Sequence, residues 1–156
     1  MTRHHEELLE AFEGLEPREY APGEHFATKV LSVHVATGKF EVTDAPPENE
    51  YIEGRHLAAL VTSPIFAPLN AATLMFPGNG YKRVSIDFYR VDFMIGAASF
   101  PTESPSDPCI EEQELSFGSD DKRLRRLVFH ARPGESIKRI EIVAGRSSID
   151  NVRMST

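Results

Sequence analysis

The chain has 156 residues, with 17 Lys or Arg, 24 Asp or Glu and a formal net charge of -7. This length fits one domain, residues 1–156, that buries roughly two thirds of the surface its unfolded form exposes. The acidic excess argues against a nucleic-acid partner, and the one basic cluster, residues 122–126, is typical of the solvated side of a strand. Since no run approaches the roughly 18 apolar residues that span a bilayer, we expect no membrane partner.

Residues 6–11 form the only helical candidate, about a turn and a half long, so we expect at most one short N-terminal helix. Residues 26–36 alternate with period two and predict a single strand whose core face carries Leu31, Val33 and Val35, together with Ala27 and Lys29. Thr37-Gly38 predicts a tight turn into a hairpin partner at residues 39–43.

Short apolar strands are expected at residues 57–62 and 72–76, on either side of a proline-containing loop, and residues 77–80 predict a turn. Residues 83–91 alternate, with Val84, Ile86 and Phe88 on the core face. Further strands follow at residues 93–100, 110–117, 124–131, 136–143 and 148–154. About ten strands at spacings near 8 to 12 residues, without long crossover helices, indicate an antiparallel all-β sandwich or barrel.

Asp150 interrupts the apolar pattern of the last expected strand. Asp is depleted from strands and is costly to bury without a partner, so something should compensate this carboxylate. Another acidic residue, Glu13, lies near the other terminus in the motif Phe-Glu-Gly-Leu. The two positions suggest a sandwich whose first and last strands meet and bring the two carboxylates together.

The chain contains three pairs of short segments, at residues 136–143 and 148–152, 12–15 and 22–26, and 72–76 and 84–88. Together they resemble bacterial jelly-roll domains of the galactose-binding-like group, which occur in exported proteins and in carbohydrate-binding modules. Residues 136–143, a glycine turn and residues 148–152 resemble the closing hairpin of that group. Residues 12–15, followed by residues 22–26, resemble its opening strand, and residues 72–76 and 84–88 fall where it places a strand pair. The resemblance implies a jelly-roll β-sandwich and an exported parent protein, although the chain as given shows no signal peptide.

The same resemblance implies a structural calcium ion bound near the first and last strands by Glu13 and Asp150. Calcium takes six to eight oxygen ligands, so backbone carbonyls would have to complete the site. The alternative is that Asp150 caps backbone amides of the preceding turn while Glu13 is solvated.

Candidate ligand contacts are Arg83, Asp87 and Tyr89, which share one face of the strand expected at residues 83–91. Sugar-binding sandwiches stack aromatic rings on pyranose faces and hydrogen-bond the hydroxyl groups with polar side chains. The chain has no Trp, which weakens a carbohydrate-binding assignment. The alternative is an ordinary polar sheet face with one aromatic ring.

Catalytic motifs are missing from the sequence: there is no Gly-x-Ser-x-Gly elbow, phosphate-binding glycine loop or zinc-protease helix. The single cysteine, Cys109, permits no disulfide within the chain, and the six histidines lack the paired spacing of a zinc site. We therefore expect a non-catalytic binding module for a saccharide or another polar group. The competing hypothesis is a structural or protein-interaction domain that binds no small molecule. The compartment and the oligomeric state stay open.

Overall fold

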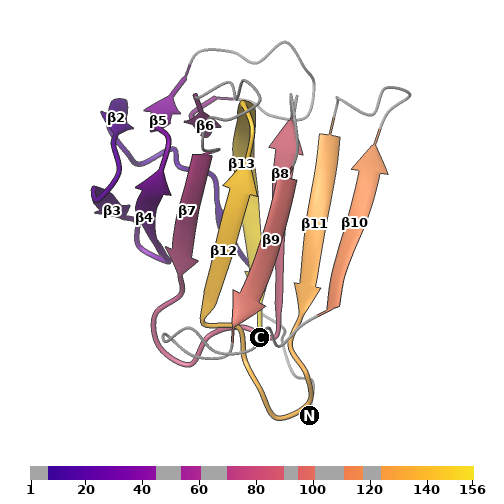
Figure 1. Ribbon diagram of the computed structural model, residues 1–156. Helices are drawn as coiled ribbons and strands as arrows, with labels where there is room; N and C mark the ends of the chain where they lie inside the picture. The colour runs from indigo at the N-terminus through magenta and orange to yellow at the C-terminus, as the bar shows by residue number, and fades with distance from the viewer. Residues whose placement is uncertain (1–6, 45–53, 61–69, 90–94, 101–110, 118–123) are drawn as a thin grey trace.

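A computed structural model of the protein describes residues 7–44, 54–60, 70–89, 95–100, 111–117 and 124–156. These residues contain thirteen strands, which form two antiparallel sheets. The two sheets form the layers of a β-sandwich (Figure 1), so the predicted fold class is confirmed. No helix occurs in these residues, and hence none long and apolar enough to cross a membrane.

The eight-stranded sheet has its strands in the order β10 (Glu111–Phe117), β11 (Leu124–His130), β8 (Arg83–Tyr89), β13 (Ser147–Ser155), β6 (His56–Ala59), β5 (Phe40–Thr43) and β2 (Arg18–Tyr20), while β1 (Glu7–Glu10) pairs with β13. The five-stranded sheet has the order β3 (His25–Ala27), β4 (Ser32–Thr37), β7 (Asn70–Met75), β12 (Arg139–Ala144) and β9 (Ile95–Phe100).

The N-terminal helical candidate does not form a helix, because residues 7–10 form β1 and pair antiparallel with residues 152–155 of β13. A helix of about six residues is marginal by itself, whereas pairing with β13 satisfies backbone groups of β1. The side chains of Leu8 and Leu9 are 37 % and 55 % exposed, so β1 adds its backbone to the sheet more than it adds to the core.

Apolar side chains of both sheets fill the space between the layers. Val84, Ile86 and Phe88 of β8 are fully buried, which confirms the predicted core face of that strand. Val33 and Val35 of β4 contribute from the opposite sheet.

The strand predicted over residues 26–36 is broken by a turn at Thr28–Leu31. The backbone amide of Thr28 donates to the Leu31 carbonyl at 2.8 Å, and the Thr28 hydroxyl accepts from the amides of Val30 and Leu31. The turn separates β3 from β4 and shifts the alternation, so Phe26 is buried whereas Ala27 and Lys29 are exposed. The predicted core face therefore holds only from Leu31 onward.

Three pairs of consecutive strands that were expected to associate lie in different sheets: β4 and β5, β7 and β8, and β12 and β13. The turns between them carry the chain from one layer to the other, as in a jelly roll. At the first crossing Gly38 has a φ of +73°, and a Cβ there would lie 2.4 Å from Asn70 Oδ1. That oxygen accepts from the Lys39 amide at 3.0 Å, and the Asn70 amide group donates to the Ala144 carbonyl at 3.2 Å.

Candidate functional site

The first and last strands meet, but the first strand is β1 and not the segment at residues 12–15 that resembles an opening strand, because residues 12–15 form a turn. One edge of β13 pairs with β8, and the other edge pairs with β6 through Ser147–Ile149 and with β1 through residues 152–155. In Figure 1, β13 runs through the eight-stranded sheet behind β12. Asp150 and Asn151 are the two residues of β13 that lie between the end of its pairing with β6 and the start of its pairing with β1.

A β-bulge sets the direction of the side chains at this point. Asp150 lies opposite Asp87 of β8, but three residues later Arg153 lies opposite Ser85, only two residues away from Asp87. The extra residue is accommodated at Asn151, whose φ is +51°, a conformation that Asn tolerates better than most residues. The bulge places Asp150 and Arg153 on the same side of β13, the side that faces away from the core.

Asp150 is buried, with 1 % of its surface exposed, and its Oδ1 atom has no hydrogen-bond partner among the described residues. Burial raises the pKa of this carboxyl group from 3.8 to about 7, and the negative charges of Glu13 and Asp87 add to the rise. A hydrogen bond from the Asn151 amide and the charge of Arg153 act in the opposite direction. Asp150 therefore bonds to the backbone of the residue that follows it, and one of its oxygens is left over.

Glu13 lies in the turn after β1, which packs against the segment leading into β6. Its Oε1 atom accepts from the Arg55 amide at 3.0 Å, and a Cβ on Gly54 would come within 2.5 Å of the same oxygen. The Arg55 guanidinium donates to the backbone carbonyls of Glu13 and Leu15. Glu13 itself is exposed, as the alternative interpretation of this residue requires, but its charge acts on Asp150.

A calcium ion fits the chemistry of this region in one respect. A buried carboxylate oxygen without a donor is the kind of ligand that calcium takes. No group of three His, Cys, Asp or Glu side chains comes together in the described part of the chain. Backbone carbonyls and water would therefore have to supply the ligands beyond Glu13 and Asp150.

Asp87, predicted as a ligand contact, is held by two arginines. Arg126 of β11 donates from Nε to Oδ1 at 2.6 Å and from Nη2 to Oδ2 at 3.1 Å, and Arg153 donates from Nη1 to Oδ2 at 3.1 Å. The hydrogen bond with Asp87 raises the pKa of the Arg126 guanidinium above its ordinary value. Asp87 is 1 % exposed, and its carboxylate accepts hydrogen bonds from the two arginine side chains.

The other two predicted contacts lie at the opposite ends of the same strand. Arg83 is half-buried at the start of β8, and Tyr89 is 8 % exposed at its end. The structure thus keeps the three residues on one strand face but does not bring them to one point. Neither Arg126 nor Arg153 is predicted as a partner of Asp87 by the sequence pattern, although Arg126 belongs to the basic cluster that is typical of the solvated side of a strand.

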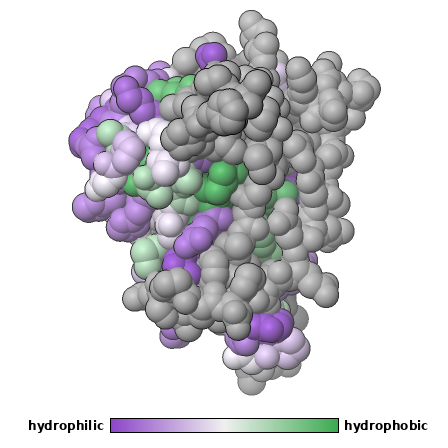
Figure 2. Space-filling model, viewed as in Figure 1, coloured by the Kyte–Doolittle hydropathy of each residue, from purple (hydrophilic) through white to green (hydrophobic). Residues whose placement is uncertain are grey.

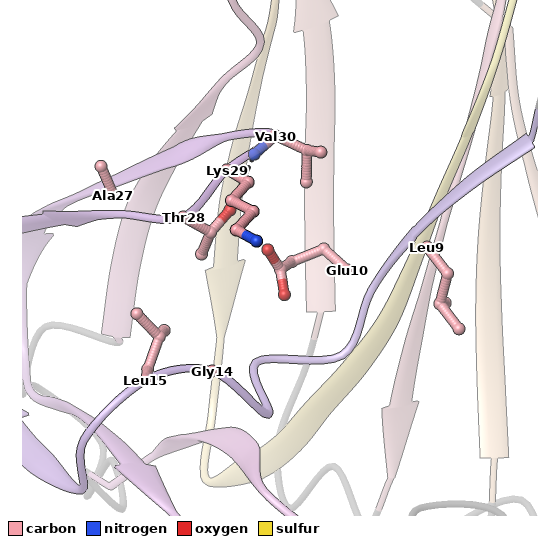
Figure 3. A pocket seen from close by; sticks show the side chains of 8 residues that line it. All are labelled: Leu9, Glu10, Gly14, Leu15, Ala27, Thr28, Lys29 and Val30. Carbon is pink, nitrogen blue, oxygen red and sulfur yellow. Dashed lines mark hydrogen bonds between the residues drawn. The ribbon is translucent and has the colours of Figure 1, made fainter.

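A cavity of about 540 Å³ lies between the region around the end of β1 and the turn that joins β3 to β4. Figure 3 shows the Lys29 amino group and the Glu10 carboxylate pointing toward one another across it. Glu10 also accepts a hydrogen bond from the Phe12 amide at 2.8 Å. The remaining walls are mostly aliphatic, formed by Leu9, Gly14, Leu15, Ala27, Thr28 and Val30. No sequence pattern indicates this cavity, because its two sides come from separate segments of the chain.

Comparison with protein-family models, with curated proteins and with solved structures finds no match to this chain. The resemblance to galactose-binding-like domains therefore stays a prediction.

Proposed function

We propose that the chain is a non-catalytic binding module in which a calcium ion, held by Glu13 and Asp150, joins the first and last strands. The observation that carries this proposal is the buried Oδ1 atom of Asp150, which has no partner among the described residues. A buried carboxylate with an oxygen that lacks a partner is costly, and a cation bound beside that oxygen would offset the cost.

The hydrogen bonds of the nearby arginines support a role for an added cation. Arg153 directs Nη1 to Asp87, and Arg55 directs Nη1 to two backbone carbonyls. None of these hydrogen bonds goes to Oδ1 of Asp150. The location also favours a linking role, because Asp150 lies where β6 and β1 meet along β13 and Glu13 follows β1.

Thermal unfolding with and without calcium tests this proposal. Calcium at about 100 times its dissociation constant stabilises a protein by about 2.7 kcal/mol, which corresponds to a rise in Tm of roughly 5–10 °C for a chain of this size. We expect this rise in the wild type, a much smaller one in Glu13→Gln and none in Asp150→Asn. Glu16→Gln, at an exposed position in the same turn region, should respond like the wild type. An identical Tm in EDTA and in calcium would refute the proposal.

The ligand that we propose is a saccharide or another polar group, contacted near Arg83, Asp87 and Tyr89. Support comes from the way in which Asp87 fixes Arg126 and Arg153, whose side chains are 24 % and 28 % exposed. Guanidinium groups held in place by a carboxylate can donate to hydroxyl or carboxylate oxygens of a ligand.

The second candidate is a protein-interaction domain without a small-molecule ligand. It is favoured by the exposure of Leu8 and Leu9 on β1. A glycan array separates the two: glycan binding that disappears in Tyr89→Ala supports the saccharide module. A stable oligomer in size-exclusion chromatography, with no glycan signal, supports the interaction domain.

A further inference from the structure

Two histidines lie directly opposite each other at the edge of the five-stranded sheet. His25 of β3 pairs in register with His34 of β4, and both side chains are exposed. Their rings are nearly parallel, with an interplanar angle of 16° and centroids 5.2 Å apart. On the face shown in Figure 2, hydrophilic residues gather over the edge of the molecule where Figure 1 places β3 and β4.

The register explains why the rings are so close. Backbone hydrogen bonds join Thr28 to Leu31 at one end of the ladder and Val35 to Glu24 at the other. Hydrogen-bonded and non-hydrogen-bonded residue pairs alternate along an antiparallel ladder. The pair of His25 and His34 comes directly after the hydrogen-bonded pair of Glu24 and Val35, so it is a non-hydrogen-bonded pair. Side chains approach most closely at such positions of an antiparallel pair.

Ser32 adds a polar group on the same face. Its hydroxyl lies 3.3 Å from Nε2 of His34, within hydrogen-bond distance. A hydrogen bond of this kind orients an imidazole ring, as the outer partners of metal-binding histidines do. The edge therefore offers two imidazoles side by side, one of them already oriented.

We propose that His25 and His34 together bind a divalent transition-metal ion of the zinc class, with water completing its coordination. Neutral imidazole is a preferred ligand of Zn²⁺, Cu²⁺ and Ni²⁺, whereas Ca²⁺ and Mg²⁺ prefer oxygen. Two nitrogens bound to one tetrahedral Zn²⁺ lie roughly 3.3 Å apart, since each Zn–N bond is about 2.0–2.1 Å. Both histidines are exposed, so we expect rotation about their side-chain torsions to bring one nitrogen of each ring to that distance.

This site is independent of the calcium proposal. It lies in the other sheet, uses nitrogen instead of oxygen, and selects a different class of metal. Its outcome and that of thermal unfolding with and without calcium can therefore be read separately on the same protein.

Isothermal titration with ZnCl₂, in a buffer that contains calcium, tests the site. Adjacent histidines at positions 4 and 5 would also bind zinc, so the titration uses a background in which both are replaced by alanine. We expect one zinc ion per chain and no heat with MgCl₂. In that background, His25→Ala or His34→Ala should weaken zinc binding by at least about tenfold, the loss that even outer-shell changes can cause.

The matched control is His130→Ala, which removes an exposed strand histidine from the other sheet and should leave zinc affinity unchanged. Circular dichroism would establish that each variant is folded. Zinc binding that persists at full affinity in the His25→Ala/His34→Ala double variant would overturn the proposal, as would the absence of zinc binding in the parent chain.

Discussion

Asp150→Asn should stabilise the calcium-free protein at high pH and leave its stability nearly unchanged at low pH. The folded state raises the pKa of Asp150 from 3.8 to about 7, so it holds the proton more tightly than the unfolded chain does. The resulting stabilisation is complete below about pH 4 and is lost as pH rises through 7. A shift of about three units corresponds to at most about 4 kcal/mol at 1.36 kcal/mol per unit. Asn keeps the shape of the side chain without the charge, so the variant escapes this loss.

Urea unfolding in EDTA at several pH values between 4 and 8.5, followed by circular dichroism, measures this difference. Subtracting the wild-type free energy of unfolding from that of Asp150→Asn removes the contribution of all other titrating groups. The difference should grow by up to about 1.4 kcal/mol per pH unit below pH 7 and then level off. Glu16→Gln should show no such trend. A difference independent of pH would refute the reasoning that burial of the Asp150 charge is unfavourable.

Two further changes test the ion network and the crossing between the sheets. Asp87→Ala leaves two partly buried guanidinium groups without their carboxylate and should lower the free energy of unfolding by about 2–4 kcal/mol. Glu135→Ala, which removes the half-buried partner of the exposed Arg132, should change it by less than about 1 kcal/mol. Urea titration checks both values, and equal losses would contradict a structural role for Asp87. Gly38→Ala should destabilise by about 3 kcal/mol or more, because the left-handed conformation is unfavourable for Ala and its Cβ meets Asn70. Gly23 has a φ of +88°, and no atom lies within 4 Å of a Cβ added there, so Gly23→Ala should lower the free energy of unfolding by only about 1 kcal/mol in thermal or urea unfolding. An equal decrease in both variants would exclude the contact with Asn70 as the cause.

The sequence pattern predicts burial better than it predicts strand pairing. Alternation identified the core face of β8, because apolar residues on the one strand face that meets the core leave a period of two wherever the strand lies. The same pattern cannot say which sheet a strand joins, since both sheets bury one face in the same way. The short glycine turns at Gly38 and Gly145 therefore suggested hairpins, although they connect opposite layers.

The candidate sites show the same limit. Asp150 could be singled out because an acidic residue in a strand is anomalous in the sequence itself. Arg126 lies 39 residues after Asp87 in the sequence. It can be identified as the partner of Asp87 only from the register in which β8 pairs with β11. The stacked pair of histidines was missed because the turn at Thr28–Leu31 was not foreseen, and only that turn folds His25 back onto His34.

The position of Asp150 follows from a spacing that is visible in the last strand. Ile149 and Val152 are both buried in the core, yet they are three residues apart, which a regular strand with a period of two does not allow. Asn151 absorbs the extra residue in a left-handed conformation that Asn adopts with little strain, and the alternation resumes at Arg153. A regular strand would have turned Asn151 into the core and Val152 out of it. The bulge instead keeps the apolar residues inside. It lies where the pairing of β13 with β6 ends and its pairing with β1 begins, so the carboxylate of Asp150 lies at the junction of β13, β6 and β1.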